Sequence, residues 1–449
     1  MPPRLSMPAA AGILTAAGIR RAARVLTASL AAPLLSAALA CTAASAAPLG
    51  GVNVLGLGSG PFPAQVDADL ATASALHARV VRTYVPWSAL QPHGPGSFDP
   101  RALAFLDRLT ADASARGIGV IMIVDSTPCW ASSAPAELLR ACASGRPEGA
   151  NAWPPRDPGD YANAMALLAR RYGPTLAALE VWNEPDQANE DYLAGPEKPE
   201  RYAALLRAAY PAIKQADPAV PVLAGSLVGS NGVFLHALYA AGIQGYYDGL
   251  SVHFYNLLLG SLRAIHETQL AAGDHTPLWL DEFGWPSCWP RLQIEQEQGC
   301  VTPGVQARNI ADTIRSLART PWVAAEVLYK LHSSSAEDFG LTDASTARGK
   351  PAFAALARAL ASPFGAPSRV VLHLRRRRGR VIASGSGPVG DYMRLEALRG
   401  KRLRYSALFT LDRFDRYSIA LPRSLGTHGL RVRVHQYWAG LARDTQASI

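Results

Sequence analysis

Leu179-Glu180-Val181-Trp182-Asn183-Glu184-Pro185 and Leu278-Trp279-Leu280-Asp281-Glu282-Phe283-Gly284 are the two stretches that decide the fold. Each begins as an apolar run typical of a buried strand and then reaches a glutamate. In barrels of eight parallel strands, catalytic groups stand at the C-terminal ends of the strands. The two stretches therefore predict an α/β protein built on a (β/α)8 TIM barrel, with Glu184 and Glu282 at its functional end.

The rest of the sequence supplies the alternation that a barrel requires. Its 449 residues, 49% of them hydrophobic, suffice for a barrel of roughly 250 residues and one small domain. Helical periodicity is found at 101–116, 161–172, 201–214 and 305–317, and Gly117 is suited to stop the first of these helices. Continuously apolar runs, as expected for parallel strands buried on both faces, lie at 52–58, 80–84, 119–125, 178–182, 221–224, 249–253, 278–281 and 325–329.

Two carboxyl groups at one end of a barrel suit the cleavage of a glycosidic bond. In a retaining reaction one carboxylate attacks the anomeric carbon and the other protonates the leaving oxygen, and the two lie about 5–5.5 Å apart. The two groups must differ in pKa. We expect Arg82 to keep Glu282 ionised, and we expect burial and the charge of Glu282 to raise the pKa of Glu184.

Trp182-Asn183-Glu184-Pro185 on a fourth strand, with Glu282 closing a seventh, resembles clan A of the glycoside hydrolases. The resemblance implies that Glu184 is the general acid/base, that Glu282 is the nucleophile and that Asn183 bonds the sugar 2-hydroxyl. Arg82 matches the second-strand arginine that supports the nucleophile. His253 and Tyr255 match the sixth-strand pair, in which the tyrosine bonds the nucleophile.

Further motifs resemble family 39 and its bacterial exopolysaccharide-hydrolase relatives. They are the stretch from Trp87 to Pro92, Pro128-Cys129-Trp130, Phe339-Gly340-Leu341 and Lys350-Pro351-Ala352-Phe353. The resemblance covers roughly residues 50–363. We expect no cofactor and no metal ion.

Aromatic residues near the strand ends are candidates to stack on sugar rings. Trp130 and Trp285 are the strongest, because each directly follows a strand end, although burial in the core explains any single aromatic equally well. Trp87, Trp182 and Trp289 share this ambiguity. At the eighth strand the clan usually has a tryptophan, whereas this chain has Tyr329-Lys330-Leu331-His332. We expect Tyr329 to take that place, or Lys330 or His332 to meet an anionic group.

Two further carboxylates flank the predicted catalytic pair. Asp281 precedes Glu282, and strand alternation predicts that it points the opposite way. Glu180, four positions before Glu184, is expected to share its face and to bind substrate or join a polar network.

The first 46 residues are interpreted as a signal peptide. The apolar stretch 25–40 is preceded by four arginines, Arg4, Arg20, Arg21 and Arg24. Ala44-Ser45-Ala46 then offers a small-residue cleavage site. The stretch is short for a membrane span, which needs about 20 residues. We therefore expect a secreted or periplasmic protein, with an uncleaved anchor, lipidation at Cys41 or a twin-arginine route as alternatives.

The cysteines fit an oxidising compartment. Without Cys41, four are left, and proximity favours bridges between Cys129 and Cys142 and between Cys288 and Cys300. Four cysteines permit three pairings. Zinc is the alternative, but spacings of about a dozen residues without paired histidines argue against it.

The composition changes after residue 363. Residues 361–368 read as a linker, so we expect a catalytic domain at 47–363 and a small all-β, sandwich-like domain at 369–449. Its predicted strands are 370–374, 380–383, 392–395, 417–421 and 430–434.

This C-terminal domain is strongly basic. It holds 17 Lys and Arg against five Asp and Glu, a net charge of +12, whereas the residues between the signal segment and 369 carry −7. The run from Arg375 to Arg378 is the densest part. The asymmetry suggests an anionic polysaccharide, cell-wall polymer or lipid surface as partner, unless the run is simply a solvated hairpin. Nucleic acid is not expected, because no recognition motif accompanies the charge.

We therefore expect a secreted retaining glycoside hydrolase that acts on a polysaccharide or oligosaccharide. The family resemblance favours a β-linked substrate and endo action. A transglycosylase that uses the same intermediate, or a non-catalytic glycan-binding barrel, are the alternatives.

Overall fold

A computed structural model provides the structure. It describes residues 47–54, 56–57, 63–147, 149–229, 232–255, 259–289, 299–334, 337–343, 349–388, 392–436 and 445–449. The predicted signal peptide lies outside these residues. No helix among the described residues is both long and apolar enough to cross a membrane.

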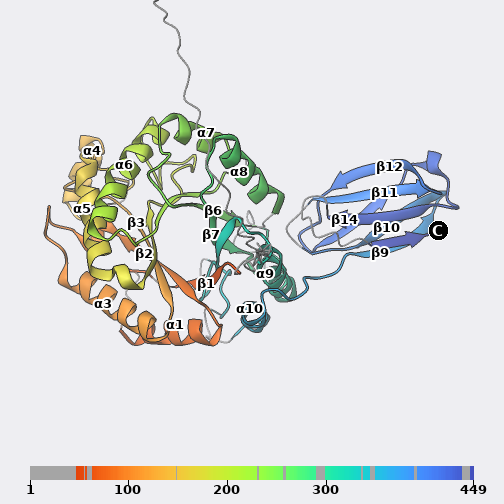
Figure 1. The fold of residues 1–449 in the computed structure, drawn as a ribbon, viewed down its shortest axis with the longest axis horizontal. Helices are drawn as coiled ribbons and strands as arrows, with labels where there is room; N and C mark the ends of the chain where they lie inside the picture. Colours follow the sequence, from red (N-terminus) through yellow and green to blue (C-terminus); the bar gives the residue numbers. More distant parts are fainter. Residues whose placement is uncertain are drawn as a thin grey trace, which may run out of the picture. The chain divides into compact units, whose positions relative to one another are not determined.

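Eight parallel strands close into a barrel in chain order, which confirms the predicted fold class (Figure 1). The first strand pairs with both the second and the eighth and so completes the ring. It lies earlier in the chain than the predicted run 52–58, because pairing with its neighbours selects 49–53. The strands are β1 (Leu49–Asn53), β2 (Val80–Pro86), β3 (Gly119–Asp125), β4 (Leu176–Val181), β5 (Val222–Leu227), β6 (Gly249–Tyr255), β7 (Leu278–Gly284) and β8 (Val323–Leu328).

Helices surround the barrel in the figure, and the four predicted ones are present (Figure 1). Their starts are fixed locally: the Asp99 carboxylate accepts hydrogen bonds from two backbone N–H groups of the first turn of α3, and Pro100 opens that helix. Gly117, at φ +66°, follows α3 in a left-handed conformation, as predicted. The helices are α1 (Pro63–Ala75), α2 (Trp87–Leu90), α3 (Pro100–Ala115), α4 (Ala136–Ala143), α5 (Pro158–Tyr172), α6 (Lys198–Ala216), α7 (Val233–Ala240), α8 (Leu259–Ala271), α9 (Pro303–Leu317) and α10 (Pro351–Ala361), with the 3-10 turn η1 (Gly173–Thr175).

Side chains from the strands build two separate apolar layers. A small cluster inside the barrel contains Val80, Ile121, Ala178, Trp279 and Val327 among others. Alternate residues of the same strands pack outward against the helices in the main core. Inward positions nearer the C-terminal strand ends are polar instead, and these polar positions form the site described below.

The C-terminal residues form two antiparallel sheets that share one apolar core, as the predicted sandwich requires. One sheet has the order β13-β10-β9 and the other β12-β11-β14-β15. Arg378 and Gly379, both at positive φ, join β9 to β10 in a tight hairpin turn. The strands are β9 (Val371–Arg377), β10 (Arg380–Ser386), β11 (Met393–Arg399), β12 (Arg402–Phe409), β13 (Arg416–Ala420), β14 (Arg431–Gln436) and β15 (Thr445–Ser448), with the turn η3 (Arg423–Leu425).

Candidate active site

Glu184 and Glu282 meet at the C-terminal end of the barrel. Glu282 lies in β7 and Glu184 follows the end of β4. One carboxylate oxygen from each, together with a ring nitrogen of His253, lie within 4.8 Å of one another. Both glutamates are buried, yet Glu282 borders a cavity of about 280 Å³ that Arg82 and Asn183 also line. The sequence therefore identified two carboxylates that the fold brings together beside an open space.

Glu282 is held by hydrogen bonds at both of its oxygens. Arg82 Nη1 donates to Oε1 over 2.5 Å, and the Tyr255 hydroxyl donates to Oε2. Arg82 is fixed in turn by Glu180, which accepts from its Nε at 2.8 Å, and by the side-chain oxygen of Asn183 at 3.1 Å. Arg82 and Tyr255 therefore both contact the candidate nucleophile, as predicted.

Asp281 does not point away from Glu282, so the orientation predicted for it from strand alternation is wrong. In the β6–β7 pairing, Val252 faces Leu280 but His253 faces Glu282, which leaves Asp281 as an extra residue. Such a β-bulge lets two successive side chains turn to one side of the sheet. As a result an Asp281 oxygen lies 3.4 Å from Arg82 Nε.

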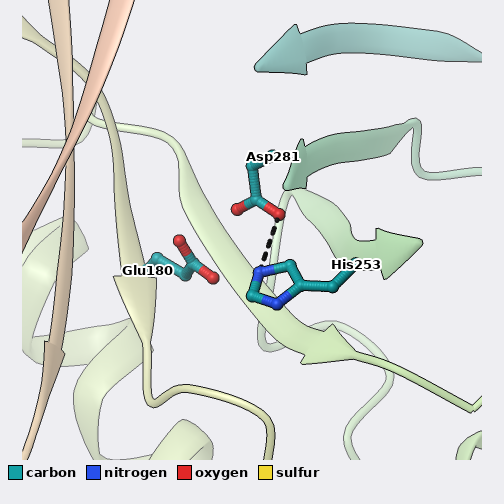
Figure 2. Close-up of side chains that lie close together, drawn as sticks. All are labelled: Glu180, His253 and Asp281. Carbon is teal, nitrogen blue, oxygen red and sulfur yellow. Dashed lines mark ion pairs between the residues drawn. The ribbon is translucent and has the colours of Figure 1, made fainter. Parts of the chain in front are cut away.

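Next to Glu184 and Glu282, the side chains of Glu180, His253 and Asp281 form a buried polar group (Figure 2). The Ser251 hydroxyl lies 3.2 Å from a Glu180 oxygen and 2.5 Å from an Asp281 oxygen, so its one hydrogen can be donated to either carboxylate. Burial raises the pKa of Glu180 to about 7, although Arg82 opposes the shift. Burial also acts to raise the pKa of Asp281, but the charge of Arg82 and the bond to His253 outweigh it and lower that pKa to about 2. Glu180 thus belongs to a buried polar network, which was one of the two roles predicted for it.

The pKa of Glu184 is shifted in the opposite direction to the one predicted. Its Oε1 lies 2.8 Å from His253 Nδ1, and its Oε2 accepts a 2.9 Å hydrogen bond from the Gln187 side chain. Burial acts to raise the pKa of Glu184, but these bonds and the charge of His253 lower it below the ordinary value. The predicted upward shift of the Glu184 pKa is therefore wrong, because it did not take His253 into account.

His253 carries the opposite shift. Burial disfavours its charged form, but the charge of Glu282 and the bonds to Asp281 and Glu184 raise its pKa well above the usual range. The two opposite shifts favour an ion pair between a protonated His253 and the Glu184 carboxylate, which Nδ1 approaches to 2.8 Å.

Of the two tryptophans predicted to stack on sugars, Trp285 is misassigned. It is 2% exposed and packs edge-on against Phe283, so it belongs to the core. Trp87 and Trp182 are also fully buried. Trp130 is half-buried, contacts Trp87 and donates to the Gln91 carbonyl. It does not line the 280 Å³ cavity, so its sugar contact stays a prediction.

The end of β8 lines the cavity with polar side chains instead of a tryptophan. Tyr329, Lys330 and His332 all border it. Tyr329 packs edge-on against Tyr255 and donates to Glu337 over 2.8 Å. Lys330 pairs with Glu337, and His332 Nε2 lies 2.8 Å from Asp69. Both basic groups are therefore already matched by carboxylates of the chain.

Sequence reasoning missed several residues at this end of the barrel. The Tyr84 hydroxyl, at the cavity wall, donates to Asp125 at the end of β3, and burial raises the pKa of that carboxyl to about 6. Burial and the charges of Glu184 and Glu282 raise the pKa of Tyr192. Asp125 could have been suspected, because a polar residue that ends a buried strand stands at the functional end of a barrel.

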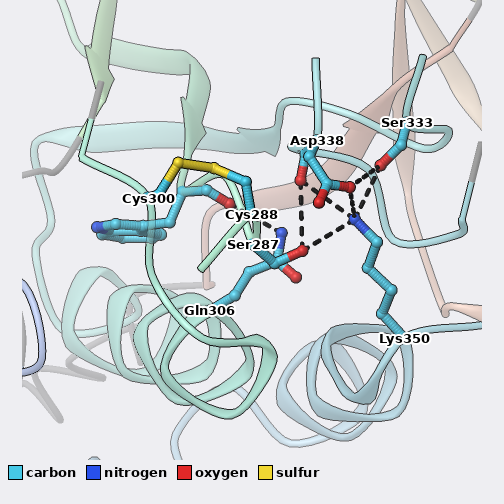
Figure 3. Close-up of a disulfide and its surroundings, with 8 residues drawn as sticks. Ser287, Cys288, Cys300, Gln306, Ser333, Asp338 and Lys350 are labelled. Atoms are coloured by element: carbon cyan, nitrogen blue, oxygen red, sulfur yellow. Dashed lines mark hydrogen bonds and ion pairs between the residues drawn. A yellow bond between two sulfur atoms is a disulfide. The ribbon is translucent and has the colours of Figure 1, made fainter. Parts of the chain in front are cut away.

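Both predicted disulfides are present, Cys129–Cys142 and Cys288–Cys300. The second fastens the chain that leaves β7 just after Glu282 (Figure 3). Next to it, the nearly buried Lys350 ammonium bonds Ser287, Ser333 and Asp338. These contacts anchor the backbone downstream of the candidate nucleophile.

Two trios in this site have the donor atoms of a metal centre, Glu180–His253–Asp281 and Glu184–His253–Glu282. The Arg82 guanidinium already contacts Glu180, Asp281 and Glu282. A cation in either trio would have to share these carboxylates with Arg82, so the arrangement suits proton chemistry better than metal binding.

A scan of the sequence against protein-family models finds no match, and a search of curated proteins finds none either. Solved structures do resemble this one. A family 39 glycoside hydrolase from the gut symbiont Bacteroides cellulosilyticus WH2 matches with a TM-score of 0.53 and 17% identity, over 84% of this chain and 80% of that one. A family 39 β-xylosidase from Caulobacter crescentus matches with a TM-score of 0.51 and 16% identity, over 84% and 95%. A family 30 subfamily 8 xylanase from Clostridium acetobutylicum matches with a TM-score of 0.51 and 14% identity, over 85% and 95%. The predicted resemblance to family 39 is thus confirmed at the level of the fold.

Proposed function

We propose that this chain is a retaining glycoside hydrolase that cleaves O-glycosidic bonds of a polysaccharide or oligosaccharide by double displacement. The observation that carries the proposal is the approach of Glu184 and Glu282 oxygens to within 4.8 Å. Retaining enzymes hold their carboxyl groups about 5–5.5 Å apart, whereas inverting enzymes need about 6.5–9.5 Å to admit a water molecule between them. The short separation therefore favours a covalent intermediate.

In the first step a Glu282 oxygen forms a bond to the anomeric carbon, and the bond from that carbon to the glycosidic oxygen breaks. Arg82 and Tyr255 hold the Glu282 carboxylate in place by hydrogen bonds to its two oxygens. The leaving oxygen takes the proton that Glu184 delivers. In the second step Glu184 accepts a proton from water, the water oxygen bonds to the anomeric carbon, and Glu282 is released.

The acid proton originates in the Glu184–His253 pair. In the free protein it resides on His253, whose Nδ1 lies 2.8 Å from Glu184 Oε1. Transfer along this hydrogen bond makes Glu184 the acid when a glycosidic oxygen reaches it. Titration then belongs to the pair and not to either residue alone.

The family resemblance favours a β-linked substrate, and two of the structural neighbours are a β-xylosidase and a xylanase, which makes β-xylosides the first candidates to test. We also propose that the protein is exported, because the two disulfides suit an oxidising compartment.

The test is a screen of the mature protein on aryl β-glycosides and acidic exopolysaccharides, with Glu184→Ala and Glu282→Ala as variants. Loss of the acid/base should lower turnover by about 10²–10⁴-fold on substrates with poor leaving groups, and azide should restore activity on an activated aryl glycoside with retained configuration. Glu282→Ala should be nearly inactive. Glu137→Ala, which removes an exposed glutamate of α4, is the matched control.

Full activity in either active-site variant would refute the assigned roles. Sugar transfer to an added acceptor, at the expense of hydrolysis, would identify a transglycosylase. Substrate binding with no product on any glycoside would indicate a non-catalytic glycan-binding barrel.

A further inference from the structure

The outer side of the β13-β10-β9 sheet is basic and lacks carboxylates. These three strands contain five arginines and no aspartate or glutamate. The other sheet is basic too, with six arginines, but it also holds Glu396. Asp412 and Asp415 lie in the turn just before β13. The three-stranded sheet is therefore distinguished by arginines that no carboxylate of its own strands accompanies.

Strand register places four of the basic side chains on the solvent side. Val381 of β10 and Tyr417 of β13 are buried in the shared core, so their neighbours in sequence face outward. Arg377 lies directly opposite Arg380, and Arg375 follows on the same side of β9. Arg416 occupies the outer side of β13. We call these four exposed residues, Arg375, Arg377, Arg380 and Arg416, the arginine face.

The positions between the charges are mixed. Ser384, Ser418 and Ala420 lie on the outer side between Arg416 and Arg375, and Ile382 lies there too, directly opposite both Ala420 and Arg375. The surface between the arginines therefore offers hydroxyl groups beside one partly buried apolar side chain. An extended polymer can lie across such a surface with its charged groups near the guanidinium groups.

Other arginines of the domain serve its own structure. Arg433 pairs with Glu396 at 2.7 Å, Arg399 donates to the Leu425 carbonyl and Arg376 donates to the Thr427 carbonyl. By contrast, among the described residues no carboxylate forms an ion pair with a guanidinium group of the arginine face, although the Asp412 carboxylate accepts a hydrogen bond from the Arg416 backbone N–H. Like charges directly opposite each other on a sheet are destabilising, as for Arg377 and Arg380, so the free domain carries a cost that an anionic ligand would relieve.

We propose that the arginine face binds a carboxylate-bearing polysaccharide, the chemical class of the polyuronates. Guanidinium groups bind carboxylates through paired hydrogen bonds. Alternate residues along a strand recur about every 6.6 Å, so arginines at such positions present a repeating row of positive charge. The proposal does not depend on catalysis by the barrel.

The same surface is poorly suited to other anionic partners. Single-stranded nucleic acid is usually bound with aromatic side chains that stack on bases, and the aromatic residue of these strands, Tyr417, is buried. Peripheral membrane binding uses several large apolar side chains that enter the lipid, whereas the outer positions between the arginines hold serine, alanine and the partly buried Ile382.

The test measures binding of the mature full-length protein to immobilised polygalacturonate in 0.15 M salt. The variant R375Q/R377Q/R380Q removes three charges from the arginine face. The control K401Q/R402Q/R404Q removes three exposed charges at the start of β12 on the other sheet. Three exposed ion pairs at about 0.5 kcal/mol each correspond to roughly tenfold in Kd. We therefore expect the first variant to bind at least about tenfold more weakly and the control to change by less than about threefold.

Each other outcome would overturn the proposal. Equal weakening by both variants would assign binding to total charge and not to this face. No binding by the unmodified protein, or equal binding to neutral dextran, would rule out a polyuronate as the ligand of the arginine face. Tighter binding to duplex DNA or to phosphatidylglycerol vesicles would identify a different partner. Thermal unfolding of R375Q/R377Q/R380Q should occur at or above the Tm of the unmodified protein, so lost binding cannot be attributed to misfolding.

Discussion

Replacing Glu326 with glutamine should stabilise the protein at neutral pH much more than at pH 4.5. Glu326 lies in β8, is 1% exposed, and alternates with Ala325 and Val327 of the inner cluster, so it faces the helix layer. Its neighbour across the β1–β8 pairing is Gly50, where an added side chain would strike Leu360 of α10. Among the described residues its Oε2 has no hydrogen-bond partner. Burial alone therefore raises the pKa of Glu326 well above its ordinary value.

The magnitude follows from proton linkage. The folded protein keeps the Glu326 proton at pH values where the unfolded chain, with a pKa of about 4.3, has lost it. Because the folded state then binds more protons, the free energy of unfolding falls by about 1.4 kcal/mol for each pH unit above that value, until the raised pKa is reached. Glutamine does not titrate. The advantage of Glu326→Gln should thus grow by up to about 2.7 kcal/mol between pH 5 and pH 7.

Urea unfolding followed by tryptophan fluorescence at pH 4.5, 5, 6 and 7 would measure this difference. Glu137→Gln alters an exposed glutamate of α4 and should stay within about 0.5 kcal/mol of the unmodified protein at every pH. A constant difference between Glu326→Gln and the unmodified protein from pH 5 to pH 7 would refute the reasoning. So would a Glu326→Gln variant that is less stable at pH 7, because that result would mean that Glu326 is ionised and paired.

Two other predictions concern the site and the chain that follows it. His253→Gln removes the group whose raised pKa lets the Glu184–His253 pair keep its proton to higher pH, so the alkaline limb of the kcat/KM profile on an aryl glycoside should move to lower pH; an unmoved limb would mean that His253 only positions Glu184. The double variant C288A/C300A, which opens a bridge between residues 12 apart, should lose about 2–4 kcal/mol of stability in urea unfolding, and a loss below about 0.5 kcal/mol would show that the Lys350 contacts alone anchor this segment.

Local patterns were enough to predict the barrel, the disulfides and the two glutamates that meet at one end of the barrel. Continuous apolar runs separated by helical stretches predict parallel strands, because such strands are buried on both faces. Glu184 and Glu282 were identifiable because each comes at or just after the end of such a run, and the strand ends of a barrel converge. The cysteine pairing followed from short separations in the sequence, since nearby residues meet most readily.

Two features of the structure differ from what the local sequence patterns predicted. β12 was missed because its leucines at 403 and 408 are exposed and its pattern becomes a strand only through pairing with β11. Trp285 follows a strand end, as a sugar platform would, but the chain turns it into the core.

Only the tertiary structure decided the electrostatics of the site. The bulge at Asp281 places a further carboxylate against Arg82 and His253, and no periodicity in the sequence marks it. The pKa of Glu184 depends on His253 from β6 and Gln187 from its own loop. The sequence specifies which groups reach the functional end of the barrel, because that depends on strand position. Their protonation depends on distances of a few ångströms between different strands, and only the folded chain sets those distances.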